Sequence, residues 1–453
     1  MKNTKTHPRS ATKLINENSR TEWSIVNPHL FVKTHFMNIK TRLVLLNFLQ
    51  FFIWGSWLLT IGKYCDNTMH WSYTEFGAIF STMGIASLLM PALAGIIADR
   101  WVNAERLYGA FHIVAAIILF TVPVIRDPTL MFWLMLLNMM FYMPTISLSI
   151  TVAYTSLEKN NRDIIKEYPP IRVWGTIGFI VALWIISLTG LGASAYQFYV
   201  ASAASLTLGA YAFTLPKCPP PGKGHKSSFV ESFGLNAFSL FRNYKMAVFF
   251  FFAMLLGASL QLTNAYGANF LDDFAKIDIY KNLISVKYPE IIMSISQISE
   301  TLFILTIPFF MKRFGIKKVM LFSMIAWVLR FGLFSFGNPA DGLWMIILSC
   351  IIYGMAFDFF NISGSLFVET QSKPEIKASA QGLFMMMTNG FGAILGSVLS
   401  GVIIEHFFRK DGISDWKGIW MTFAIYSLVV AVAFAILFRH KHDRKTFLSP
   451  TNH

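Results

Sequence analysis

Charged side chains are scarce in this sequence. Only 14% of the 453 residues are Asp, Glu, Lys or Arg, whereas 55% are hydrophobic. A soluble globular protein carries charge on about a quarter of its residues, so the composition excludes an ordinary soluble domain. The apolar residues are gathered in runs of about 20, the length that crosses a hydrocarbon layer about 30 Å thick. The sequence therefore predicts an all-α membrane protein.

Cysteines are also few, and no enzyme motif is present. The three cysteines, Cys65, Cys218 and Cys350, form no CxxC pair, so we expect neither a disulfide framework nor a metal site. The sequence contains no HExxH, no GxSxG and no Walker loop. We therefore expect no enzymatic activity, no catalytic residue and no cofactor. A soluble region large enough for the sensor domain of a receptor is also absent.

The net charge of +14 has two interpretations. In a soluble protein such an excess of positive charge would favour nucleic acid as a partner. Here Lys and Arg are concentrated in the loops and at the chain ends, where they set membrane topology and contact anionic lipids. We therefore expect membrane lipids as partners and no binding of nucleic acid.

Twelve apolar segments cover most of the chain and predict twelve transmembrane helices. A longer connection between the sixth and seventh segments contains PKCPPPGKGHKSS and is typical of a linker. It divides the chain into six spans plus six. The predicted ranges are 43–63, 74–98, 107–125, 130–154, 171–189, 194–214, 246–270, 289–311, 317–337, 342–368, 380–404 and 417–438.

The predicted organisation has five parts. They are a polar, basic tail over 1–36, a six-helix half over 37–214, the linker over 215–245, a second half over 246–438 and a tail over 439–453. The first tail lacks an apolar stretch with a cleavage site, so it is not a signal peptide. An alternative is that translation starts at Met37. If the N-terminus is cytoplasmic, the loops on that side hold about twice as many Lys and Arg as the opposite loops, so we expect both termini to be cytoplasmic.

A short motif occurs at matching places in the two predicted halves. GIIADRW (95–101) follows the second span, and PFFMKRFGIKK (308–318) follows the eighth. Two related halves around a site at the midplane are one plan of secondary transporters. Gly95, Asp99 and Arg100 resemble the G-x-x-x-D-R loop of the major facilitator superfamily. The resemblance implies a loop that gates the cytoplasmic side, and the alternative is an ordinary positively charged turn.

The most costly residue in the predicted spans is Glu300, near the middle of EIIMSISQISETLFILTIPFF. An acidic group at a helix centre costs about 2.5–3.5 kcal/mol on insertion scales. Gln297 lies three residues earlier and shares its helical face. Such a group predicts a functional site on a water-filled path, although a neutral, hydrogen-bonded carboxyl group is an alternative.

Two other predicted spans carry polar groups. Gln261 and Asn264 share a face of GASLQLTNAYGANF, where their amides either hold helices together or bind hydroxyls and base edges. Asp358 follows Phe357 in IIYGMAFDFFNISGSLFVE. Burial would favour the neutral form of its carboxyl group. The neighbouring aromatic rings either stack on a flat ligand or pack against lipid and the protein core. Asp358 and Glu300 are therefore the candidates for binding a proton.

Two arginines lie within predicted spans. Arg172, in YPPIRVWGTIGF, either reaches the cytoplasmic interface or points inward, with Thr176 and Phe179 further along a similar face. Arg330 lies in the middle of the ninth predicted span, and a carboxylate could neutralise its charge. We assign Arg330 no role toward the substrate.

Several long motifs together resemble the bacterial nucleoside:proton symporter family, nucleoside permeases within the major facilitator superfamily. These are FLQFFIWGSWLLTIGKY, MPALAGIIADRW, PPIRVWGTIGF, LQLTN, SISQISETLFILTIPFF and AFDFFNISGS. The resemblance extends over residues 37–442. It implies the twelve-helix fold of that superfamily, uptake of purine and pyrimidine nucleosides driven by the proton gradient, alternating access, a bacterial inner-membrane location and a monomer.

The resemblance also implies which residues bind the substrate: Arg172, Thr176, Phe179, Gln261, Asn264, Gln297, Glu300, Phe357 and Asp358. The amides and Glu300 would pair with ribose hydroxyls or base edges, and Phe179 and Phe357 would stack on the base. Asp358 or Glu300 would bind the proton, and Arg172 would assist its release. A proton-coupled sugar or polyol symporter of the same fold is the alternative, because it needs the same amides and carboxylates.

Overall fold

The computed structural model describes residues 38–220, 235–373, 376–410 and 412–440. The predicted tail over 1–36, the alternative start at Met37, the middle of the linker and all but two residues of the C-terminal tail lie outside the described residues. The described residues from Ile39 onward form one compact unit. The division of the chain into two six-helix halves stays a prediction.

Nearly all the described elements are helices. Before the linker they are α1 (Ile39–Gly55), α2 (Ile61–Lys63), η1 (Tyr64–Thr68), α3 (Tyr73–Arg100), α4 (Ala104–Thr121), η2 (Val122–Val124), α5 (Pro128–Lys159), α6 (Ile164–Leu188) and α7 (Tyr196–Ala212).

After the linker the elements are η3 (Leu235–Arg242), α9 (Tyr244–Asp272), η4 (Asp273–Lys276), α10 (Ile284–Lys287), α11 (Pro289–Ile304), α12 (Ile307–Phe314), α13 (Ile316–Phe336), α14 (Leu343–Gln371), α15 (Lys377–Met385), η6 (Met386–Gly392), α16 (Ala393–Ile403), η7 (Ile404–Phe408), β1 (Arg409–Lys410), β2 (Ile413–Ser414) and α17 (Trp416–Leu437). The two short strands pair in antiparallel register.

Each predicted span coincides with one helix or with consecutive helices. Among the described residues, nine helical stretches are long and apolar enough to cross a membrane, or ten if α11 and α12 count as one broken span. α1 and α7, with 17 residues each, are shorter and cover two further predicted spans. The structure thus confirms an all-helical membrane protein, and twelve crossing helices stay a prediction.

The predicted span over 289–311 is not one straight helix. α11 and α12 meet at an angle of 55°. Pro308 lies in the first turn of α12, where its missing backbone N–H costs nothing, whereas it could not continue the hydrogen-bond ladder of α11. The predicted span over 289–311 therefore corresponds to two helices that together are long and apolar enough for one broken span.

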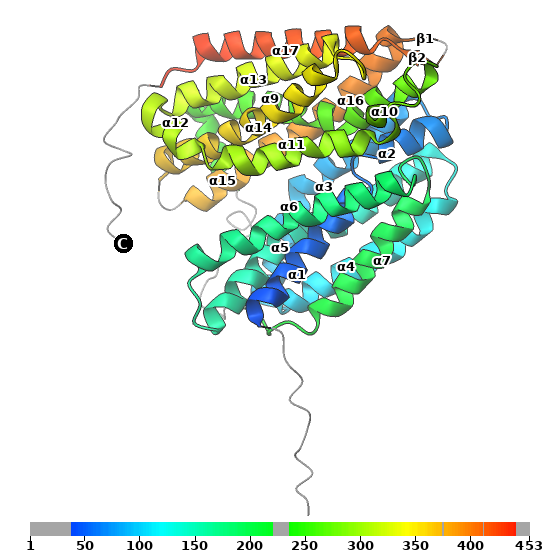
Figure 1. The fold of residues 1–453 in the computed structure, drawn as a ribbon. Helices are drawn as coiled ribbons and strands as arrows, with labels where there is room; N and C mark the ends of the chain where they lie inside the picture. Colours follow the sequence, from blue (N-terminus) through cyan, green and yellow to red (C-terminus); the bar gives the residue numbers. More distant parts are fainter. Residues whose placement is uncertain (1–37, 221–234, 374–375, 411, 441–453) are drawn as a thin grey trace, which may run out of the picture. The chain divides into compact units, whose positions relative to one another are not determined.

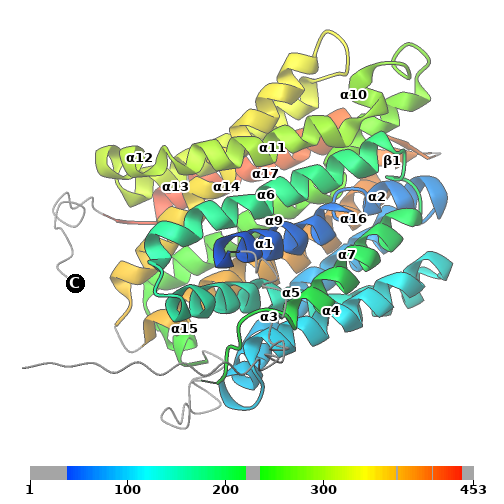
Figure 2. The same ribbon diagram turned by 60° about the horizontal axis from the view of Figure 1, so that its bottom comes forward.

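The helices pack in a regular set of neighbours. Before the linker α1 packs against α6, α3 against α5 and α4 against α7, and after it α13 and α11 pack against α14. Contacts between helices on opposite sides of the linker join α3 to α16 and α6 to α11, and Figures 1 and 2 both show the second pair side by side.

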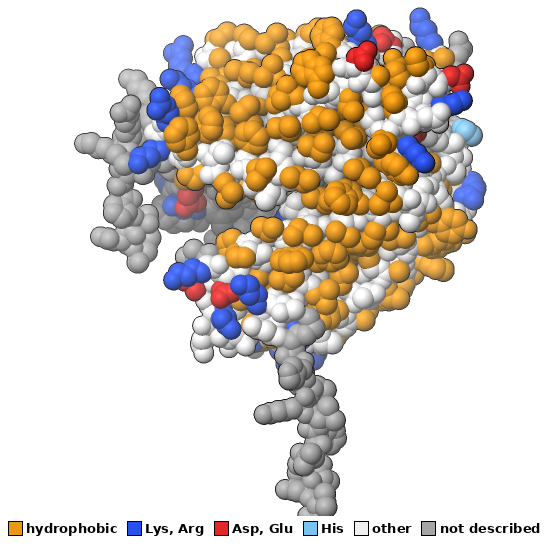
Figure 3. Space-filling view, viewed as in Figure 1, with side chains coloured by type: hydrophobic (Ala, Val, Ile, Leu, Met, Phe, Trp, Pro, Cys, Tyr) orange, Lys and Arg blue, Asp and Glu red, His pale blue; other side chains and the backbone are white. Residues whose placement is uncertain are grey.

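The surface is apolar where a membrane would cover it. Figure 3 shows hydrophobic side chains over the length of the helices, with most Lys, Arg, Asp and Glu near the helix ends. Exposed residues of this surface include Leu305 on the α11–α12 break and Val429 on α17. A hydrocarbon layer is the environment in which such an apolar surface is stable.

Candidate functional site

Three helices from the second part of the chain carry most of the predicted site. α9 provides Gln261 and Asn264, α11 provides Gln297 and Glu300, and α14 provides Phe357 and Asp358. Asn264 and Gln297 line one small cavity together. Phe357 lines a second one, against α9 and η6.

The two acidic residues of the predicted site interact with each other. Glu300 of α11 and Asp358 of α14 are near enough for electrostatic repulsion between their ionised forms. Glu300 also interacts with Arg172 of α6. An arginine before the linker and two carboxyl groups after it are thus electrostatically linked, although no ion pair joins them among the described residues.

Arg172 is half-buried on α6, and its charge interacts with Glu300 of α11. Its guanidinium lies 4.0 Å from the centre of the Phe51 ring of α1. Of the two alternatives that the sequence allowed, the structure favours the inward orientation over a side chain that extends to the interface. A role of Arg172 toward a substrate stays a prediction.

Three oxygen atoms of the predicted site are buried without a hydrogen-bond donor among the described residues. They are the Oε1 atoms of Gln261 and Gln297 and the Oδ2 atom of Asp358. A buried polar atom that lacks a partner costs about 1–3 kcal/mol. The predicted site therefore keeps hydrogen-bonding capacity that the protein itself does not use.

An aromatic stack lies beside these groups. Phe357 is parallel to Tyr353, with 5.8 Å between ring centroids and an angle of 6° between the planes. Asn361 and Asn389 line the cavity next to Phe357. Rings and amides side by side suit a ligand that is flat on its faces and polar at its edges.

Not all predicted site residues are brought together. Thr176 is half-buried and Phe179 is buried on α6, where the backbone of Phe179 packs against Gly55. Among the described residues, no hydrogen bond or ring contact joins Thr176, Phe179 or Gln261 to the other predicted site residues. Their roles stay predictions.

The predicted gating loop is not a loop. Gly95, Asp99 and Arg100 belong to the last two turns of α3, which ends at Arg100. The matching motif over 308–318 likewise covers α12 and the start of α13, and its turn is made by Gly315 with φ 78°. A helix that ends at its charged residues has its cations near the C-terminal carbonyls, which the helix dipole favours. The gating role itself stays a prediction.

Arg330 has a different environment from the one expected. It is 1% exposed on α13, and no ion pair of the described residues includes it. Its guanidinium instead contacts hydroxyl groups, a backbone carbonyl and two rings. The suggested carboxylate partner was therefore wrong.

The close packing of α11 on α14 depends on Gly354. A Cβ atom at this position would lie 2.6 Å from the Ser299 carbonyl oxygen and 2.9 Å from the Glu300 backbone nitrogen. We expect Gly354→Ala to force the helices apart, to lower the free energy of unfolding by about 1–3 kcal/mol and to reduce transport. Thermal unfolding of the purified protein and uptake assays would measure both effects.

Gly332 of α13 provides a matched control, because a Cβ atom there would meet nothing within 4 Å. Gly332→Ala should leave stability unchanged or raise it slightly, since alanine favours a helix over glycine. Equal melting temperatures for the two variants would contradict the importance of the Gly354 contact.

Sequence reasoning missed a second group of polar residues, near the side predicted to face outside. The Nζ atom of Lys63, on α2, donates to Asp272 Oδ1 at 2.8 Å and to Glu290 Oε1 at 3.0 Å. Ser187 of α6 donates to Glu290 Oε2 at 2.6 Å. The Glu290 side chain is 1% exposed, so this ion pair is buried.

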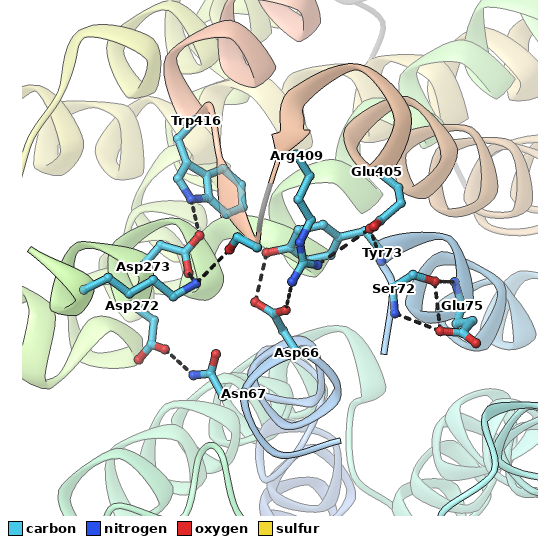
Figure 4. A network of polar contacts seen from close by, with 12 residues as sticks. Asp66, Asn67, Ser72, Tyr73, Glu75, Asp272, Asp273, Glu405, Arg409 and Trp416 are labelled. Carbon is cyan, nitrogen blue, oxygen red and sulfur yellow. Dashed lines mark hydrogen bonds and ion pairs between the residues drawn. The ribbon is translucent and has the colours of Figure 1, made fainter. Parts of the chain in front are cut away.

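A second branch of this group surrounds Arg409 (Figure 4). Arg409 pairs with Asp66 of η1 and lies 4.5 Å from the Tyr73 ring centre. Glu405 accepts a hydrogen bond from the Tyr73 backbone N–H at 2.8 Å, and Asn67 donates to Asp272 at 2.6 Å.

We call these ion-paired residues the outer cluster, with Lys63, Asp66, Asp272, Glu290, Glu405 and Arg409 as members. Within the part of the chain that the structure describes, every ion pair between residues on opposite sides of the linker belongs to it. Glu290, which follows Pro289 at the start of an apolar span, was the sequence feature that could have indicated this cluster. A buried carboxylate needs a cation as its partner.

Comparison with known proteins gives a consistent result. A family model described as nucleoside H+ symporter matches residues 37–443. Xanthosine permease of Escherichia coli (strain K12) is 53% identical over 90% of this chain and 97% of that protein. Nucleoside permease NupG of the same strain is 49% identical over 90% of this chain and 98% of that protein.

Solved structures agree with these sequence matches. The crystal structure of nucleoside transporter NupG is 49% identical and has a TM-score of 0.85, covering 89% of this chain and 100% of that chain. A bacterial homologue of the human lysosomal transporter Spinster shares the fold at 13% identity, with a TM-score of 0.65. The long motifs of the sequence, the all-helical fold and the matched residues lead to one conclusion: this chain belongs to the nucleoside H+ symporter family.

Proposed function

We propose that this protein carries nucleosides into the bacterial cell together with protons, across the inner membrane and without chemical change of the solute. The observation that carries the proposal is the grouping, within apolar helices, of two interacting carboxyl groups with amide groups and stacked rings. Membership of the nucleoside H+ symporter family supports the same function.

The unpaired oxygen atoms explain why a nucleoside is a suitable substrate. Gln261, Gln297 and Asp358 each offer a buried acceptor, and a nucleoside offers ribose O–H and base N–H donors. Its base presents a flat face to rings such as Phe357. Hydrogen bonds to an ionised Glu300 would be the strongest of the set, because charge-assisted bonds are about twice as strong as neutral ones.

The two carboxyl groups are the proposed carriers of the proton. Repulsion between Glu300 and Asp358 favours one proton shared by the pair, and the positive charge of Arg172 favours its release. Arg172 lies before the linker and the carboxyl groups lie after it. A change in the distance between them would therefore change how tightly the proton is held, which couples proton binding to conformation.

The proposed transport cycle is alternating access, in which two six-helix halves rock around the site. The outer cluster holds elements from both sides of the linker together at the end predicted to face outside. We propose that these contacts close the outer side of the protein in one state of the cycle. We further propose that the protein works as a monomer with both termini in the cytoplasm.

Uptake of radiolabelled uridine into proteoliposomes with an imposed inward proton gradient tests the proposal. We expect accumulation that adenosine inhibits, that glucose and xylose leave unchanged, and that a protonophore abolishes. Uptake of a sugar without uptake of uridine would replace the substrate and favour the sugar or polyol symporter. Equilibration of uridine regardless of the gradient would rule out the proton as a coupled ion.

A further inference from the structure

We infer that Arg330 is a positioning residue for the nucleoside site: its guanidinium fixes the three helices that present the site to one another. The inference rests on the proposed function, because it concerns how that site is held. Arg330 lies on α13, a helix from which no residue is predicted to bind the substrate.

The guanidinium reaches all three of the site's helices. Nη1 donates to the Ser349 carbonyl oxygen of α14 at 2.6 Å, and Nη2 lies 3.3 Å from Ser296 Oγ of α11. Nε lies 3.4 Å from Thr263 Oγ1 of α9. The same group is 4.7 Å from the centre of the Tyr353 ring of α14.

Three of these four contacts, those to Thr263, Ser296 and Tyr353, lie next to a predicted site residue. Thr263 directly precedes Asn264, and Ser296 directly precedes Gln297. Tyr353 stacks on Phe357. Arg330 also lines the cavity that Asn264 and Gln297 share. A shift of this one side chain would therefore displace two amides and an aromatic ring together.

Only an arginine can make this set of contacts. Its guanidinium presents five donors in a rigid plane, whereas lysine has a single rotating ammonium group. A buried charge without a counterion is costly, and an apolar residue of similar size would pack at lower cost if the site needed only filling. The surrounding hydroxyls, carbonyl and rings spread the positive charge over several partners. Since α13 provides no predicted ligand, we assign the role of Arg330 to the geometry of the amides.

The test is the affinity of purified variants for uridine, measured by titration in detergent, together with the half-saturation concentration for uptake. For Arg330→Gln and Arg330→Lys we expect about tenfold weaker binding and a similar rise in the half-saturation concentration. A change in melting temperature alone, with unchanged affinity, would overturn the inference, because it would show a purely structural role. Absence of uridine binding by the unaltered protein would instead refute the proposed function.

Phe334→Leu is the matched control. The Phe334 ring lies 5.0 Å from the same guanidinium but is on α13 and is not adjacent to a predicted site residue. Its affinity for uridine should stay within about twofold of the unaltered protein, since it removes packing and leaves the hydrogen bonds in place.

If the Arg330 variants do not fold, variants that lack the hydroxyl groups contacted by Arg330 test the inference instead. Ser296→Ala and Thr263→Val each remove one hydroxyl contact and should weaken uridine binding about threefold. When combined with Arg330→Gln, either change should add little further, because the contact is already lost. Additive losses, or unchanged affinity in both single variants, would overturn the positioning role.

Discussion

Replacement of Asp358 by asparagine should abolish accumulation of uridine against a gradient while leaving the exchange of uridine across the membrane. Asparagine has nearly the shape of a protonated aspartate but cannot release a proton. A membrane potential of 100 mV supplies about 2.3 kcal/mol per charge, which corresponds to roughly 50-fold accumulation for one proton per nucleoside. We expect Asp358→Asn to reduce this ratio to about one. Uptake of uridine driven by a proton gradient would measure accumulation. Counterflow of uridine without a proton gradient would measure exchange.

Glu300→Gln should behave differently if the two carboxyl groups have separate roles. Because Glu300 is the proposed charged acceptor for ribose hydroxyls, its neutralisation should weaken binding, by about 1.5–3 kcal/mol for a hydrogen bond to a charged group. Glu369→Gln serves as a control, since Glu369 lies at the C-terminal end of α14 and pairs with Lys377 at 2.6 Å. Uphill accumulation by Asp358→Asn would exclude Asp358 as the proton carrier. In that case, a loss of coupling in Glu300→Gln would assign the proton to Glu300.

The central residues were predictable from the sequence because they violate a simple rule. Carboxyl and amide groups in apolar helices are expensive, so Glu300, Asp358 and Gln297 stood out without knowledge of any contact. The structure places them on helices that pack against one another, as that reasoning required. The inward direction of Arg172 depended on depth and on the Phe51 ring, neither of which the sequence specifies.

Apart from Glu290, the outer cluster was not predictable from the sequence, for the opposite reason. Lys63, Asp66 and Arg409 lie at or just beyond the ends of the predicted spans, where charged residues are common and do not indicate a site. The paired residues are also far apart in the sequence, so no local spacing reveals them: 227 positions separate Lys63 from Glu290, and 343 separate Asp66 from Arg409. The environment of Arg330 escaped prediction likewise, because its partners come from three other helices.

Replacement of Lys63 by methionine should open the protein to the outside. Lys63 is the cation between Asp272 and Glu290, and its removal would leave two carboxylates facing each other with little solvent. Loss of one partner of a buried ion pair costs about 3–5 kcal/mol, and here the cost falls mainly on the closed state. A shift of that size changes the ratio of two conformations by a factor on the order of 100 or more. The variant should therefore spend much of its time open to the outside and transport more slowly.

A cysteine at Ala268 would report this opening. Ala268 is 2% exposed, lies one helical turn from Asp272 and lines the cavity shared by Asn264 and Gln297. A membrane-impermeant maleimide added from outside should label Ala268→Cys at least tenfold faster with Lys63→Met than without it. The three native cysteines are buried, so protein without the added cysteine gives the background.

The matched control for this experiment is Lys276→Met. Lys276 pairs with Asp273 at 2.8 Å, but both residues belong to η4, and the Lys276 side chain is 48% exposed. Loss of this pair should leave labelling unchanged, because an exposed ion pair within one element contributes little and does not differ between the two states. Equal labelling in both lysine variants would show that the outer cluster does not hold the transporter closed. Faster labelling with Lys63→Met and near-normal labelling with Lys63→Arg would identify the positive charge between Asp272 and Glu290 as the group that must be displaced in each cycle.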